Sequence, residues 1–304
     1  MLAPTTLPQD LDALKRRVAL HSLLWALLLT TLKLGVGLFT HSLGVLSEAL
    51  HSGLDLVAAG VTLLAVRASA IPADESHNYG HGKAESLAAL VEVILLLGTS
   101  IVIIVRAIDR LVGGAPLELQ SGAVGIAVMV IAIAIDTWRA KALKSVAEVT
   151  HSDALDADAL HFSSDVASSF AVIVGLGLAM LGWKTADAIA ALIVAAFVIR
   201  ASARIGKQAF DTMMDRTPEA LADRIAVVVD DTPGVRAHQD LRVRAWGSVA
   251  DVDVTIKVDR DLSLIAAHTI SEEVEARIVE LSPGAVVSIH FEPMDATTSL
   301  SANA

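Results

Sequence analysis

The 304-residue sequence predicts an α-helical membrane protein with six transmembrane helices followed by a cytoplasmic α+β domain. Hydrophobic residues make up 54% of the chain and charged residues 19%, and the mean hydropathy is +0.61. Soluble globular chains are nearer to about 45–50% apolar and about 25% charged. The net negative charge is concentrated in the second part of the chain. Residues 208–304 carry 17 acidic and 8 basic side chains, whereas residues 1–207 carry 17 acidic and 15 basic side chains. Together these observations indicate a membrane part followed by an acidic soluble domain.

Six stretches in the first part are long and apolar enough for a spanning helix, which needs about 20 residues. They are residues 18–39, 43–66, 87–112, 121–138, 160–182 and 185–206. We therefore expect an N-terminal cytoplasmic segment at 1–17, a six-helix transmembrane domain at 18–207, a soluble domain at 208–293 and a tail at 294–304. The first apolar run is too long for the hydrophobic region of a signal peptide, so we expect no cleaved leader.

Basic residues gather on one side of the predicted spans. They precede the first span, flank the connection after the second, and follow the fourth and sixth. They are Lys15, Arg16, Arg17, Arg67, Lys83, Arg139, Lys141, Lys144, Arg200, Arg204 and Lys207. Because such residues favour the cytoplasmic side, both termini are expected in the cytoplasm. The high alanine content and the lack of a targeting segment favour a bacterial inner membrane.

The composition excludes several classes of protein. The chain has no cysteine, which excludes disulfide scaffolds, thiol catalysis and cysteine-type zinc or iron–sulfur sites. A net charge of −11 argues against nucleic acid as a partner. Any soft metal must therefore be bound by the ten histidines and the carboxylates, and we expect no organic cofactor.

Two predicted spans carry the same pair of metal-ligating residues. The segment HSGLD places His51 four residues before Asp55, and HFSSD places His161 four residues before Asp165. Residues four apart share one face of a helix, so each pair can chelate one ion. Ionisable residues at membrane depth are costly and mark functional sites. An ordinary helix-stabilising contact is the alternative for either pair, but it does not explain why the pair occurs twice.

Two such pairs facing each other offer two imidazole nitrogens and two carboxylate oxygens. Four ligands of these types in a tetrahedron suit Zn²⁺. Imidazole also suits cobalt, nickel and iron, whereas Mg²⁺ and Ca²⁺ prefer oxygen ligands throughout.

The loop after the second span, PADESHNYGHGKAES, contains a second candidate cation site. Asp74, His77 and His81 are spaced by three and four residues. Spacing alone leaves a polar surface loop with two incidental histidines as an open alternative.

These motifs together resemble those of the cation diffusion facilitator family. The resemblance rests on HNYGHGKAESLAAL, on HSGLD and HFSSDV at these relative positions, and on six spans with a cytoplasmic tail. It extends from about residue 15 to Pro293 and is closest to bacterial zinc and iron exporters with a short cytoplasmic domain. It implies a homodimer in the lipid bilayer that exports divalent metal from the cytoplasm in exchange for protons.

The resemblance implies that His51, Asp55, His161 and Asp165 form the transport site. Some bacterial members of the family have aspartate where His51 stands. The version with two histidines and two aspartates resembles the more zinc-selective branch, which tolerates cadmium less.

The resemblance also assigns five residues near the membrane boundary. Asp74, His77 and His81 fall where the family has a loop metal site. Lys83 and Asp215 fall where its members form a charge interlock of the dimer.

Residues 218–293 predict the order helix, strand, strand, helix, strand. EALADRIAVVVDD and the segment 262–282 have helical apolar spacing, while DLRVRAW and VADVDVTIKVD alternate, and AVVSIHF reads as a last strand. This α+β pattern resembles the metallochaperone-like domain of the family, which dimerises.

Some zinc exporters of the family bind metal in this domain, and here His268, His290 and Glu292 fall on ligand positions. Gln239 and Thr255, however, stand where zinc-binding members have histidines. We therefore expect a dimerising domain with a weak or absent metal site.

Metal binding requires neutral imidazole and ionised carboxylate, and a free imidazole titrates at about pH 6.5. Protons should thus compete with the ion, which predicts Zn²⁺/H⁺ antiport. Within the transporter class, export of Fe²⁺, Co²⁺, Cd²⁺ or Mn²⁺ is the alternative. A membrane metal sensor is a remote alternative, and an integral-membrane metalloprotease is disfavoured because the chain has no HExxH segment.

Overall fold

The computed structural model describes residues 8–40, 43–113, 123–180, 185–247 and 249–294. The chain divides into two compact units, one formed by Gln9–Met213 and the other containing Met214–Ala304.

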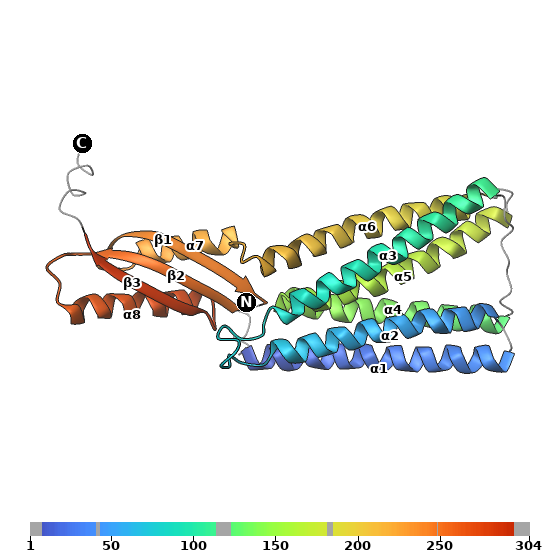
Figure 1. Ribbon diagram of the computed structural model, residues 1–304, viewed down its shortest axis with the longest axis horizontal. Coiled ribbons are helices and arrows are strands. Elements are labelled where there is room, and N and C mark those ends of the chain that lie inside the picture. Colours follow the sequence, from blue (N-terminus) through green and yellow to red (C-terminus); the bar gives the residue numbers. More distant parts are fainter. Residues whose placement is uncertain (1–7, 41–42, 114–122, 181–184, 248, 295–304) are drawn as a thin grey trace, which may run out of the picture. The chain divides into compact units, whose positions relative to one another are not determined.

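Six long helices form the first unit (Figure 1). They are α1 (Pro8–Thr40), α2 (Leu43–Ser69), α3 (Ala84–Gly113), α4 (Ala123–Thr150), α5 (Asp153–Met180) and α6 (Ala186–Met213). Among the described residues, four segments are long and apolar enough to cross a membrane: Asp10–Phe39, Ala49–Ser69, Ala84–Val112 and Ala188–Met213. The predicted fourth and fifth spans reach into residues outside the described ranges. Membrane crossing by α4 and α5 therefore stays a prediction.

Several helices extend beyond the predicted spans. α1 begins at Pro8 instead of residue 18, and α4 continues to Thr150 instead of ending at residue 138. Hydropathy marks only the length that fits the hydrocarbon layer. The polar extension RAKALKSVAEVT is rich in good helix formers, so the helix continues past the apolar part.

α5 contributes to the two larger clusters of buried side chains in the bundle. One joins α5 to α3 and α6 through Ala89, Ala157 and Ala209. The other packs Leu155 and Phe162 of α5 among apolar residues of α1, α2 and α4. Small residues allow helices to approach closely. α5 is consequently packed between the two groups of helices, and its residues Asp158 and His161 are buried inside the unit.

Glu85, in the first turn of α3, ties several helices together. It is buried and accepts hydrogen bonds from Lys15 Nζ at 2.7 Å, from Ser69 Oγ at 2.6 Å and from the Ser152 hydroxyl. These donors lie on α1, on α2 and immediately before α5. One carboxylate thus links four segments of the unit.

The second unit contains α7 (Glu219–Asp230), β1 (Val235–Trp246), β2 (Val249–Val258), α8 (Leu264–Leu281) and β3 (Val286–Pro293). The sheet order is β1-β2-β3, with β1 antiparallel and β3 parallel to β2. This order of elements confirms the predicted α+β domain.

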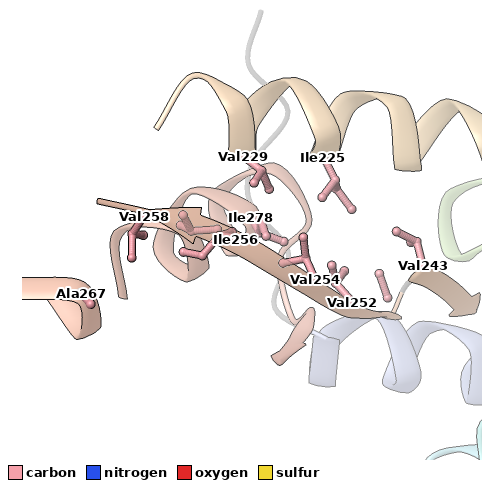
Figure 2. Packing of buried hydrophobic residues seen from close by; sticks show 11 residues of the cluster. Ile225, Val229, Val243, Val252, Val254, Ile256, Val258, Ala267 and Ile278 are labelled. Carbon is pink, nitrogen blue, oxygen red and sulfur yellow. The ribbon is translucent and has the colours of Figure 1, made fainter. Parts of the chain in front are cut away.

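One face of this sheet is covered by both helices. Alternate residues of β2, from Ala250 to Val258, are buried against Ile225 and Val229 of α7 and Ile278 of α8 (Figure 2). A strand presents successive side chains to opposite faces, so Asp253, Thr255 and their neighbours in register lie on the other face. The domain therefore has an apolar covered face and a polar open face.

Candidate metal centre

α2 and α5 bring the four predicted transport ligands together. His161 Nε2 lies 3.2 Å from Asp55 Oδ1 and 3.6 Å from Asp165 Oδ2. His51 Nε2 lies 3.7 Å from Asp165 Oδ1 and 4.0 Å from Asp55 Oδ1. Each carboxylate group is thus within reach of both imidazoles, and each helix supplies one of each kind.

The two histidine side chains of this site differ in solvent exposure. The His161 side chain is 7% exposed, whereas that of His51 is 43% exposed. Ligand atoms of His51, Asp55 and Asp165 all lie within 4.8 Å of one another. A metal bound at about 2.0–2.2 Å from each donor would fit among them after small side-chain movements.

A cavity of about 240 Å³ adjoins these ligands. Its lining includes His51, Asp55 and Asp165, and also Lys33 of α1 and Asp136 of α4. A water molecule occupies about 30 Å³ in the liquid, so the cavity has room for an ion that keeps part of its hydration shell.

Lys33 and Asp136 are charged cavity residues that the sequence analysis did not single out. Lys33 is buried and its Nζ donates to Ser52 Oγ at 2.7 Å. Asp136 Oδ1 accepts a hydrogen bond from Arg139 Nη1 at 3.0 Å. Both lie within predicted apolar spans. The signal that identified His51 and Asp55, an ionisable residue at membrane depth, was therefore present for them as well.

Further buried polar groups lie on α5 and on α3. Asp158 of α5 and Glu92 of α3 are fully buried. Ser22 Oγ donates to Asp158 Oδ2 at 3.3 Å, and the Thr62 hydroxyl donates to Glu92. Buried carboxylates are stable in such surroundings only when they have partners, so this polar interior extends beyond the four ligands.

The loop residues Asp74, His77 and His81 also converge. Asp74 Oδ1 lies 3.5 Å from His77 Nδ1, and Asp74 Oδ2 lies 3.6 Å from His81 Nε2. The two imidazole rings have centroids 4.3 Å apart. The structure therefore brings three donors to one place on the loop, as a cation site requires.

Local hydrogen bonds hold Asp74 in its ionised form. The Ser76 hydroxyl donates to Asp74 Oδ1 at 2.8 Å, and the His77 backbone N–H donates to the same atom at 2.7 Å. These bonds, the Ser76 hydroxyl first, lower the pKa of Asp74 to about 2. Asp74 is thus an acceptor-only carboxylate over the whole neutral and mildly acidic range.

Lys83 and Asp215, the predicted interlock, belong to different units. Lys83 Nζ donates to the Met213 carbonyl at 3.3 Å, and Asp215 Oδ2 lies 3.6 Å from Arg244 Nη1. Their pairing stays a prediction.

The candidate ligands of the soluble unit are only partly brought together. His290 Nε2 lies 3.4 Å from Glu292 Oε1 on the open face of the sheet. His268 instead contacts Glu272 Oε1 at 3.6 Å on α8, which packs on the covered face. Within one described chain, His268 is therefore separated from the other two.

A cation of the chain itself already contacts Glu292. Lys257 donates a hydrogen bond to this carboxylate, and the contact holds the pKa of Glu292 below its usual range. The register places Gln239 opposite Thr255, and Thr255 opposite His290. One row across the open face thus contains a single imidazole beside an amide and a hydroxyl.

A helical membrane unit with nitrogen and oxygen donors between its helices, followed by a small α+β domain, defines an integral-membrane transporter of metal cations. Residues 19–214 match the cation efflux transmembrane domain, and residues 217–294 match the cytoplasmic domain of cation efflux proteins. The chain belongs to this cation efflux family, the cation diffusion facilitators, and is a multi-pass membrane protein rather than an enzyme.

Two bacterial relatives illustrate the likeness. A cation-efflux pump FieF of Klebsiella pneumoniae subsp. pneumoniae is 35% identical over 286 residues, which cover 94% of this chain and 95% of the relative. A protein of the same name from Salmonella arizonae is 34% identical with the same coverage.

Solved structures of variants of MamM CTD overlap with a quarter of this chain. One is 28% identical and has a TM-score of 0.25, with 95% of that chain covered. Another is 31% identical and has a TM-score of 0.24, with 96% covered.

Proposed function

We propose that the protein exports a divalent metal ion, foremost Zn²⁺, from the cytoplasm in exchange for protons. The observation that carries this proposal is the convergence of His51, Asp55, His161 and Asp165 between α2 and α5, at distances of 3.2–4.0 Å. Two imidazole nitrogens and two carboxylate oxygens are a donor set that Zn²⁺ takes tetrahedrally. Mg²⁺ and Ca²⁺ prefer shells of oxygen only.

Exchange for protons follows from the chemistry of the donors. A histidine binds metal only in its neutral form and a carboxylate only when ionised, so binding a metal releases protons. A site that opens to an acidic exterior would exchange its metal for protons, and a site that opens to the cytoplasm would do the reverse. An inward proton gradient would then drive export.

We further propose that the protein works as a homodimer in the bacterial inner membrane, with both termini in the cytoplasm. The match to the cytoplasmic domain of cation efflux proteins supports the dimer. The gathering of basic residues at one side of the spans supports the orientation.

Two further assignments accompany the transport site, and a third metal site is weaker. We propose that Asp74, His77 and His81 form a second metal site on the loop, because their donors already converge. We also propose that Lys83 and Asp215 form the charge interlock of the dimer near the membrane boundary.

A third metal site at His268, His290 and Glu292 would need a rearrangement, since the described chain separates His268 from the others. The Lys257 contact with Glu292 also weakens this site, because an ammonium group competes with a metal for the carboxylate.

The metal could instead be Fe²⁺, Co²⁺ or Cd²⁺, since imidazole and carboxylate serve these ions too. Mn²⁺ is disfavoured because its sites are usually rich in oxygen. A metal sensor would bind the ion at the same residues without moving it across the membrane.

The test is ion flux into proteoliposomes that contain the purified protein and a pH indicator. Zn²⁺, Fe²⁺, Co²⁺, Cd²⁺ and Mn²⁺ are added separately, for the natural protein and for Asp55→Asn. The matched control is Asp109→Asn, because Asp109 is an exposed carboxylate on α3.

We expect Zn²⁺ flux with opposite proton movement, lost in Asp55→Asn and kept in Asp109→Asn. Flux of a different metal that is also lost in Asp55→Asn would change the proposed substrate but support the same site. Retained flux in Asp55→Asn would refute the site, and metal binding without any flux would support the sensor.

A further inference from the structure

A groove between α1 and α4 lies apart from the metal ligands. It has a volume of about 290 Å³ and is lined by apolar side chains of both helices, including Val18 and Val146. Its other lining residues are basic and aromatic, from Arg17 and His21 of α1 and Trp138 and Arg139 of α4, together with two serines. No acidic side chain lines the groove among the residues that the structure describes there.

Arg139 is a buried guanidinium at the inner wall of this groove, with only 2% of the residue exposed. Its Nη1 donates to Asp136 Oδ1, its Nη2 donates to Ser22 Oγ, and the group lies 3.6 Å from the centre of the Phe162 ring. Its Nε has no hydrogen-bond partner within the described residues. The Nε–H of the buried Arg139 guanidinium is thus an unsatisfied hydrogen-bond donor beside the groove.

The face of α1 that lines the groove carries polar and aromatic residues, and exposed apolar residues follow farther along the helix. Arg17, His21 and Trp25 follow one another at intervals of four residues, so they share one face of α1. Trp25 contacts Trp138 of α4 edge-on, with ring centroids 6.0 Å apart. Tryptophan is enriched at the headgroup level of membranes. Farther along α1, Leu28 and Leu32 are exposed apolar residues on the same side of the helix.

We propose that this groove binds an anionic phospholipid. Arg17 and His21 contact the phosphodiester headgroup, the tryptophan pair lies at the level of the glycerol backbone, and the acyl chains follow Leu28 and Leu32. Guanidinium groups are well suited to phosphate oxygens, and basic pockets between membrane helices bind anionic headgroups. The apolar walls favour a lipid over a free anion, because only a lipid also has apolar parts to place against them.

The location strengthens the assignment. α1 begins at the polar N-terminal end of the chain, and Arg17 lies within its first turns. If the N-terminus is cytoplasmic, the groove opens at the headgroup level of the cytoplasmic leaflet, where anionic lipids attract basic residues. The inference rests on the proposed membrane placement of α1 and α4 and on a cytoplasmic N-terminus, but not on the identity of the transported metal.

The first test is native mass spectrometry of the purified full-length protein with added dioleoyl phosphatidylglycerol or dioleoyl phosphatidylcholine. We expect phosphatidylglycerol to be retained preferentially and its occupancy to fall by about fivefold in Arg17→Gln. Arg16→Gln is the matched control, because Arg16 is an exposed neighbour of the same charge that does not line the groove. Its occupancy should match that of the natural protein.

A second measurement uses the tryptophan pair as a reporter in vesicles. Brominated phosphatidylglycerol should quench tryptophan fluorescence more strongly than brominated phosphatidylcholine at the same mole fraction. Trp138→Phe, which keeps an aromatic ring against Trp25, should reduce this excess, because one of the two reporters is lost.

Three results would overturn the proposal. Equal losses in Arg16→Gln and Arg17→Gln would show general attraction to the basic surface. Equal retention or equal quenching by the two lipids would show that the headgroup is not recognised. Displacement of the bound lipid by an excess of inorganic phosphate would show a site for soluble anions.

Discussion

His161 of α5 contacts Asp55 of α2 more closely than either residue approaches its partner on its own helix. The distance from His161 Nε2 to Asp55 Oδ1 is 3.2 Å, against 3.6 Å for His161–Asp165 and 4.0 Å for His51–Asp55. The donor set is therefore shared between two helices. A displacement of α2 against α5 would alter the donor contacts on both, so we predict that metal binding at these residues is coupled to movement of the bundle.

Replacing His51 should change metal selectivity more than it changes the fold. His51→Asp exchanges one nitrogen donor for an oxygen, and oxygen donors favour harder ions such as Mn²⁺. We expect the ratio of Mn²⁺ flux to Zn²⁺ flux to rise in proteoliposomes. Thermal unfolding should be little altered, because this side chain is 43% exposed. An unchanged ratio would show that His51 is not a ligand.

Lys33 should weaken metal binding at the cavity. Its buried ammonium lines the same space as His51 and Asp55, and like charges repel most strongly where water is scarce. Lys33→Met should tighten Zn²⁺ binding by about fivefold, on the order of 1 kcal/mol. Isothermal titration of the purified protein measures this change. Lys207→Met, on an exposed lysine of α6, is the control and should leave the affinity unchanged.

The loop site should depend on Asp74 equally at neutral and mildly acidic pH. Because the pKa of Asp74 is lowered, its carboxylate is ionised at neutral and mildly acidic pH. It becomes protonated only as the pH falls through about 2. Asp74→Asn should therefore reduce loop Zn²⁺ affinity by one constant factor between about pH 7 and about pH 5.5.

Calorimetry on an Asp55→Asn background isolates this loop site. Glu75→Gln, which removes the neighbouring exposed acid, provides the comparison. If Asp74→Asn reduced the Zn²⁺ affinity by a smaller factor at acidic pH than at neutral pH, the assignment of Asp74 as a loop ligand would be contradicted. An equal loss of affinity in Glu75→Gln would contradict it as well.

Glu85 should contribute strongly to the stability of the membrane unit. Its buried carboxylate accepts hydrogen bonds from three segments, and removing one partner of a buried ion pair costs about 3–5 kcal/mol. Glu85→Gln should lower the Tm in detergent clearly. Glu148→Gln removes an exposed contact of 3.9 Å with Lys144 and should cost less than about 1 kcal/mol. Similar Tm values for the two variants would refute the structural role of Glu85.

The soluble domain should unfold more easily when its covered face loses volume. Ile256 is fully buried on β2, so Ile256→Ala should cost about 2–5 kcal/mol. Ile265→Ala, at a residue of α8 that is 79% exposed, should change stability by no more than about 0.5 kcal/mol. Chemical denaturation followed by circular dichroism compares them. Equal midpoints would mean that the covered face is not the core.

Local periodicity was enough to predict the element order of the soluble domain. Alternation in VADVDVTIKVD identifies β2 because its residues face the core and the open side in turn. The same reasoning did not show that His268 lies away from His290. That separation depends on which face of the sheet α8 covers, and this is decided by packing between residues distant in sequence.

The helix ends were less predictable than the helices. Hydropathy follows the thickness of the membrane, whereas a helix continues as long as backbone hydrogen bonds and good helix formers continue it. The extension of α4 to Thr150 and the start of α1 at Pro8 are therefore invisible to an apolar window.

The chain alone specified the two His–Asp pairs, because a spacing of four places both groups on one helix face and their burial in a membrane is too costly without a purpose. It also specified the apolar lengths and the acidic domain after them. The shorter cross-helix contacts, the cavity shared with Lys33 and Asp136, and the groove between α1 and α4 depend on how separate helices pack. Packing brings together residues more than 100 positions apart, such as Asp55 and His161, and no local spacing records which faces will meet.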